Sequence, residues 1–124
     1  MSSTQREVVM SDFKVSEVPL GHGLLDLGRV VKTIRQVRRH AHFNLEMITR
    51  DPLKIPCLTD NYWKTFPHRN GQYLADALTL VHVHTRSHPL PLVSGLPPDA
   101  QLNLEEENVT KCVDYIRTRL GFVS

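Results

Sequence analysis

One short apolar run with a carboxylate in its middle constrains the fold of this chain more than any other feature. The run extends from Phe43 to Ile48 and carries Glu46. Its length and composition predict a β-strand that ends at the polar turn of residues 49–52. An ionised carboxylate is costly inside a strand unless a metal ion, a cation or a solvated cleft compensates it. Because ligands collect at the C-terminal ends of strands in α/β folds, Glu46 is a candidate site residue.

Three helices are predicted from apolar residues at helical spacing. The first spans residues 27–40 after the N-cap Asp26, with an apolar stripe on one side and basic residues mostly on the other. The second spans residues 72–84. The third is expected to begin near Asn103, where the segment Asn103–Glu106 approximates a capping box, and to stop at Gly121.

Few segments remain that could pair with the predicted strand. Residues 12–20 alternate loosely and predict a short strand or an extended loop, and the turn Gly21-His22-Gly23 follows. A lone strand cannot pair with itself, and an isolated two-stranded sheet is marginally stable. The order of helix, short connection and apolar strand is typical of α/β folds. The chain therefore looks like part of a larger α/β structure.

Composition limits the remaining possibilities. The chain has 124 residues, a length expected for one domain, and its 40% hydrophobic content argues against disorder throughout. Residues 1–11 are polar and expected to be flexible, and they contain no apolar core of a signal peptide. No apolar stretch approaches the roughly 20 residues of a membrane-spanning helix. Cys57 and Cys112 fit no metal or redox spacing, which favours reduced thiols in a cytoplasmic protein without membrane contact.

The segments VPLGHGLLDL and FNLEMITRDPLKIP resemble the xylose-isomerase-like superfamily of sugar isomerases and epimerases, which are (β/α)8 TIM barrels. The resemblance extends from about Glu17 over most of the chain. It implies that residues 12–124 are the C-terminal part of an incomplete barrel: the loop after strand seven, helix seven, strand eight and helix eight. Strand eight would be the run from Phe43 to Ile48.

The resemblance also implies a site. In this superfamily the strand-eight glutamate ligates a divalent metal ion such as Mn, Mg or Zn, and often helps to move a proton during isomerisation through an enediol. Only Glu46 carries over as metal ligand and catalytic residue, since the other ligands come from strands that this chain lacks. His22 also stands where the family usually has an acidic residue. A solvated Glu46, or one paired with Arg50 or Lys54, is the alternative.

Arg50 is a candidate substrate-binding residue, because its guanidinium can hold a carboxylate or phosphate with two donors. It could equally pair with Asp51 or with a helix end. The expected function is that of the C-terminal part of a metal-dependent sugar isomerase or epimerase, inactive without the missing strands. It would bind a sugar or sugar phosphate only in a complete barrel. A non-catalytic fragment or protein-interaction module that retains the family surface is the alternative, and self-association is expected.

Three other features have simpler explanations. His82, His84 and His88 suggest a metal site, but the first two fall at the end of a predicted helix, where residues two apart diverge. Tyr62 and Trp63 could stack on a sugar, but such aromatic residues more often close a core. The basic side of the first helix favours a solvated surface over nucleic-acid binding, because no aromatic residues are interleaved with its charges.

Overall fold

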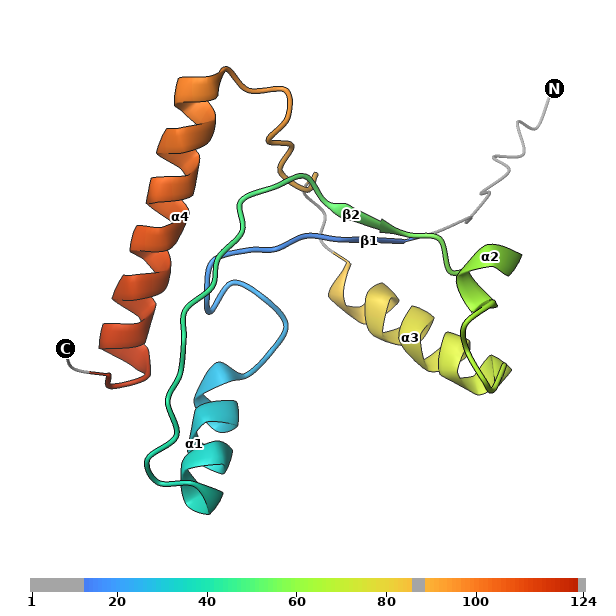
Figure 1. The fold of residues 1–124 in the computed structure, drawn as a ribbon, viewed down its shortest axis with the longest axis horizontal. Coiled ribbons are helices and arrows are strands. Elements are labelled where there is room, and N and C mark those ends of the chain that lie inside the picture. The colour runs from blue at the N-terminus through green and yellow to red at the C-terminus, as the bar shows by residue number, and fades with distance from the viewer. Residues whose placement is uncertain (1–12, 86–88, 123–124) are drawn as a thin grey trace, which may run out of the picture. The chain divides into compact units, whose positions relative to one another are not determined.

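The computed structural model describes residues 13–85 and 89–122. Those residues form a small mixed α/β protein with four helices and a two-stranded sheet (Figure 1). The elements in chain order are β1 (Phe13–Val15), α1 (Leu27–Val37), β2 (Leu53–Ile55), α2 (Asp60–Trp63), α3 (Gly71–His84) and α4 (Pro98–Arg119). They divide into two compact units. The sheet unit comprises β1, β2, α2 and α3, and the helix unit comprises residues 16–52 and the described residues from 90 onward, with α1 and α4.

The sheet unit is built around one short antiparallel pairing and an aromatic cluster. Phe13 of β1 lies opposite Ile55 of β2, and Val15 lies opposite Leu53. The aromatic cluster is formed by Tyr62, Trp63 and Phe66, whose ring centroids lie 5.0–5.3 Å apart. The Trp63 indole N–H donates a hydrogen bond of 2.7 Å to the carbonyl of the buried Cys57. This bond satisfies the one polar atom of the indole, as is usual for a tryptophan that packs in an apolar cluster.

The second predicted helix agrees well with α3. Its start is fixed by Asn70, whose side chain accepts a hydrogen bond from the Gln72 amide. The residues predicted to point inward are half-buried, whereas the rest of the helix is mostly exposed. These inward residues are Leu74, Ala77, Leu78 and Val81. The 3.6-residue spacing therefore identified the correct face.

The helix unit is held together at the buried Cys112 of α4. Its Sγ accepts a hydrogen bond of 3.3 Å from the amide of Leu20, and the side chain is fully buried. The chain then turns at Gly21, which has a φ of 84°. A side chain there would be strained, and its Cβ would overlap the Tyr115 ring. Only glycine therefore permits the close contact between this turn and α4.

Two predicted helix boundaries need correction. α1 begins as expected, with the Asp26 carboxylate accepting the Arg29 amide, but it ends at Val37 and not at residue 40. α4 begins at Pro98, five residues before the predicted start, so Asn103 lies inside the helix and forms no capping box. Proline at the first helical position has no amide to leave unsatisfied, and its fixed φ suits a helix start. Gly121, with a φ of 67°, ends α4 as predicted.

The strand prediction for Phe43–Ile48 was wrong. This run is an irregular segment, drawn out between α1 and β2 in Figure 1. Among the described residues, residues 42–52 make no backbone–backbone hydrogen bond. The reason is that a strand exists only with a partner, and the one pairing available, that with β1, is taken by β2. The pairing of β1 with β2 is antiparallel, whereas a (β/α)8 barrel has parallel strands, so the described residues give no evidence of a barrel segment.

Candidate functional site

The irregular segment of residues 41–50 keeps the side-chain alternation of a strand, except at the exposed Leu45. Phe43, Met47 and Thr49 are half-buried, and Leu45 is 37% exposed. The residues between them are exposed; they are His42, Asn44, Glu46, Ile48 and Arg50. An alternation with a period of two indicates an extended chain with one covered and one open side.

The covered side of this segment faces α4 and the residues that follow it. The Phe43 ring meets the Phe122 ring edge-on, with centroids 5.3 Å apart. At the other end, the Asn108 side chain donates a hydrogen bond of 3.0 Å to the Thr49 hydroxyl. Phe43 and Thr49 therefore point toward α4 and the residues after it, whereas Leu45 between them is exposed. Glu46 lies on the opposite, open side.

The Glu46 carboxylate has no hydrogen bond or ion pair with any described residue. Neither Arg50 nor Lys54 makes an ion pair with it, although both were possible partners by sequence. An exposed carboxylate is hydrated, so its placement costs little and leaves it free to bind a cation.

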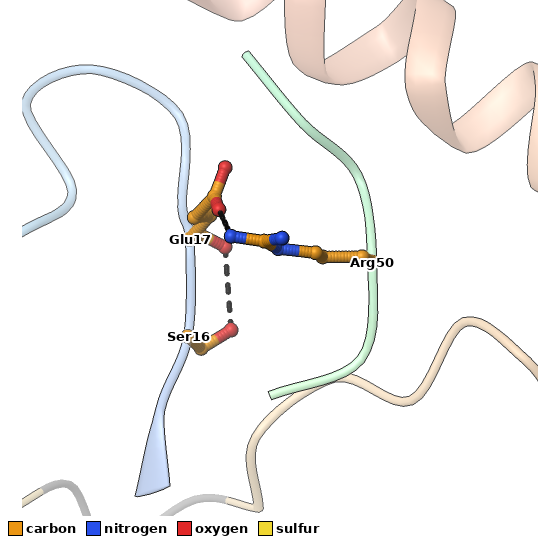
Figure 2. A network of polar contacts seen from close by, with 3 residues as sticks. All are labelled: Ser16, Glu17 and Arg50. Atoms are coloured by element: carbon orange, nitrogen blue, oxygen red, sulfur yellow. Dashed lines mark hydrogen bonds and ion pairs between the residues drawn. The ribbon is translucent and has the colours of Figure 1, made fainter. Parts of the chain in front are cut away.

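Arg50, the predicted substrate-binding residue, is already occupied. Its guanidinium forms an ion pair with the carboxylate of Glu17, as Figure 2 shows. The residues come from two segments of the helix unit that lie side by side at this point, and the Ser16 hydroxyl donates a bond of 3.2 Å to the Glu17 carbonyl. The two charged side chains remain 43% and 33% exposed, so a ligand anion could compete for Arg50 at modest cost.

Asp51 anchors the C-terminal end of the irregular segment to residues 93 and 94 of the helix unit. Its carboxylate accepts hydrogen bonds from the Val93 amide at 2.5 Å, the Ser94 amide at 2.9 Å and the Ser94 hydroxyl at 2.5 Å. The Ser94 hydroxyl bond, followed by the two amide bonds, lowers the pKa of Asp51 below its usual value. Val93 is one of the buried residues of the structure. Asp51 is therefore a structural anchor and does not pair with Arg50.

A complete metal site is not present in the described part of the chain. Within residues 13–85 and 89–122, no group of three or more His, Cys, Asp or Glu side chains is arranged to hold a metal ion. Divalent cations such as Mg and Mn require several oxygen or nitrogen ligands, and Glu46 alone does not meet that requirement. The residues present therefore do not fit a resident metal ion.

The histidine cluster gives no alternative metal site. His82 and His84 lie in the last turn of α3, and the Nδ1 atom of His84 is 2.9 Å from the Leu80 carbonyl. His88, the third histidine of the sequence pattern, lies outside the described residues. The helical placement supports the simpler explanation given to the pair from sequence.

Glu17 and Ser94 are the residues of this region that sequence reasoning missed. Glu17 was seen only as the start of the family resemblance, and Ser94 lies in a proline-rich loop. Neither pairing has a signal in local spacing, because 33 and 43 residues separate the partners. The sequence offered two local signals for these pairings. They were an isolated carboxylate, Glu17, before the turn Gly21-His22-Gly23 and the dipeptide Asp51-Pro52.

Comparisons with known proteins give no relative for this chain. No protein family matches it, and no match is found among curated proteins or solved structures. Among the helices that the structure describes, none has the length and apolar character needed to cross a membrane.

Proposed function

We propose that the helix unit is a piece of a metal-dependent sugar isomerase or epimerase to which it contributes one carboxylate, that of Glu46. The observation that carries the proposal is the alternation along residues 41–50. One side of the segment is covered by α4, and the side with Glu46 is open. Strand eight of the proposed (β/α)8 barrel has the same two sides, one toward helices and one toward the ligand.

The lack of a paired strand along its edges, among the described residues, accounts for the irregular backbone of this segment. Its backbone has no ladder partner among the described residues, and its side chains still alternate as in a strand. Neighbouring strands from other polypeptide would complete the hydrogen bonds and bring the remaining metal ligands next to Glu46. Arg50 would then exchange its ion pair with Glu17 for a sugar hydroxyl or phosphate.

The first test is metal binding by the chain itself. Calorimetry with manganese, magnesium and zinc should give weak binding or none, because one hard carboxylate cannot replace a full ligand set. Tight stoichiometric binding that disappears in Glu46→Gln would show that the chain holds its own site, contrary to the proposal. Tight binding that disappears only when His82 and His84 are changed would move the metal to α3.

The second test supplies the missing part. The coding sequence next to that of this chain should encode further βα units, and co-expression of the two parts should produce exchange of a sugar C2 proton with solvent when manganese is present. Glu46→Gln should abolish this exchange, whereas the matched change Glu105→Gln, on the exposed surface of α4, should leave it intact. Exchange that persists in Glu46→Gln would remove Glu46 from the reaction.

A non-catalytic interaction module is the second candidate, and the exposed side of α1 favours it. Val30, Ile34 and Val37 lie on one side of this helix and are 41%, 39% and 88% exposed. An apolar helix side of this kind is the usual surface for docking on another protein. The change Ile34→Gln should then abolish capture of a defined partner protein. If it does so while Glu46→Gln has no effect on any activity, this candidate replaces the first.

A further inference from the structure

A groove lined by four cations lies in the helix unit, between α1 and the C-terminal end of α4. Its cationic side chains are Lys32, Arg35 and Arg39, from α1 and the turn after it, and Arg119 from α4. The groove has a volume of about 510 Å³, and Gln36 adds a neutral hydrogen-bonding group. None of the described residues that line it is acidic. Glu46 is not part of it, so the groove is independent of the proposed isomerase site.

The sequence concentrates positive charge at this place. No Asp or Glu occurs between Asp26 and Glu46, and this stretch contains five Lys and Arg residues. Lys32 and Arg35 are three residues apart and lie on the same side of α1, and Arg39 joins them from the turn after the helix. Among the described residues, none of the four groove cations makes a hydrogen bond or ion pair through its side chain. Their mutual repulsion is thus relieved by no acidic neighbour.

Arg35 is held in place by aromatic rings. Its guanidinium carbon lies 4.2 Å from the centroid of the Phe122 ring and 5.9 Å from that of Phe43. Cation–π contacts of this kind orient the guanidinium plane and leave its N–H donors unused. A donor set that is oriented before binding loses less entropy when an anion arrives.

Stabilisation of helix ends explains only part of this arrangement. Arg35 and Arg119 lie in the last turns of α1 and α4, where positive charge suits the helix dipole. Lys32 lies in the middle of α1 and Arg39 lies beyond its end, so neither is placed for that purpose. All four nevertheless line one groove.

We propose that this groove binds a small, multiply charged, phosphate-bearing molecule. Guanidinium and ammonium groups are the usual partners of phosphate oxygens, and the volume lies in the range of small-molecule sites. A nucleic-acid strand fits less well, because the described lining residues include no aromatic side chain that could stack on bases. The assignment rests on the helix unit alone.

Titration calorimetry of the full chain with inorganic pyrophosphate tests this. Lys32→Gln and Arg39→Gln should each weaken binding about tenfold, since each removes a charge-assisted contact. The matched changes Arg29→Gln and Arg38→Gln remove the same charge from the same stretch but not from the groove. They should weaken binding about twofold or less, through screened long-range attraction only.

Amide chemical shifts locate the binding site, and circular dichroism shows whether each variant keeps its helices. Pyrophosphate should shift the amides of α1 and Leu120 in the unaltered chain, which locates the site even if a variant loses helix. Equal losses in all four variants, or no saturable binding at millimolar pyrophosphate, would refute the groove. A single-stranded oligonucleotide that displaces pyrophosphate and binds more tightly with length would assign a nucleic-acid surface instead.

Discussion

At the scale of single residues, Asp51 makes the stability of the helix unit depend on pH. Hydrogen bonds from Ser94 and Val93 lower its pKa in the folded chain. In the unfolded chain the pKa of this carboxyl returns to about 3.9. Its contribution to the stability of the helix unit is therefore complete above that value and is lost as the pH falls through the lower folded value. We expect urea unfolding of the helical signal to show a contribution from Asp51 that declines below about pH 4.

The change Asp51→Asn should remove this dependence and lower stability at neutral pH, because the amide nitrogen that replaces Oδ2 cannot accept the Ser94 hydroxyl bond and the two amide bonds to Oδ1 lose their charged acceptor. Asp114→Asn is the matched control. It removes an exposed carboxylate of α4 whose side chain makes no bond to a described residue. If Asp51→Asn keeps the acid-dependent loss of the unaltered chain, Asp51 is not its source.

At the scale of elements, local patterns predicted the three longer helices, with shifted ends for α1 and α4, but missed α2 and misplaced the strand. α1 and α3 follow from their caps at Asp26 and Asn70 and from apolar spacing, which are properties of the segment itself. A strand depends on a distant partner, which no pattern in residues 43–48 contains. The same limit applies to the site. Glu46 was proposed as a site residue from its immediate neighbours, whereas the pairing of Arg50 with Glu17 depends on segments far apart in the chain.

The segment of residues 42–52 should behave as an unpaired strand. Its amides make no backbone hydrogen bond with the described residues, so we expect hydrogen exchange within seconds at neutral pH, while the central amides of α4 stay protected. Binding of the proposed missing βα units should slow exchange at residues 43–48 and leave α3 unchanged. Strong protection in the free chain would mean that this segment already has a partner, such as a second copy.

At the scale of the whole molecule, the apolar core is small. Among the described residues only three side chains are buried, namely Cys57, Val93 and Cys112. Large apolar residues are exposed on several elements, and α1 has three of them on one side, Val30, Ile34 and Val37. A chain that buries so little apolar surface has little to offset the conformational entropy lost on folding. It is expected to be weakly stable alone or to associate.

We therefore expect light scattering of the purified chain to show concentration-dependent association and thermal unfolding to be broad. Association should involve the apolar side of α1, because its exposed residues form one continuous stripe. Ile34→Gln should weaken association about tenfold, the factor expected when one large apolar side chain no longer becomes buried. Gln36→Ala, on the other side of the same helix, should have little effect. A sharp cooperative melt from a clean monomer would show that the chain completes its own core, and the proposal that it is part of a larger barrel would then fail.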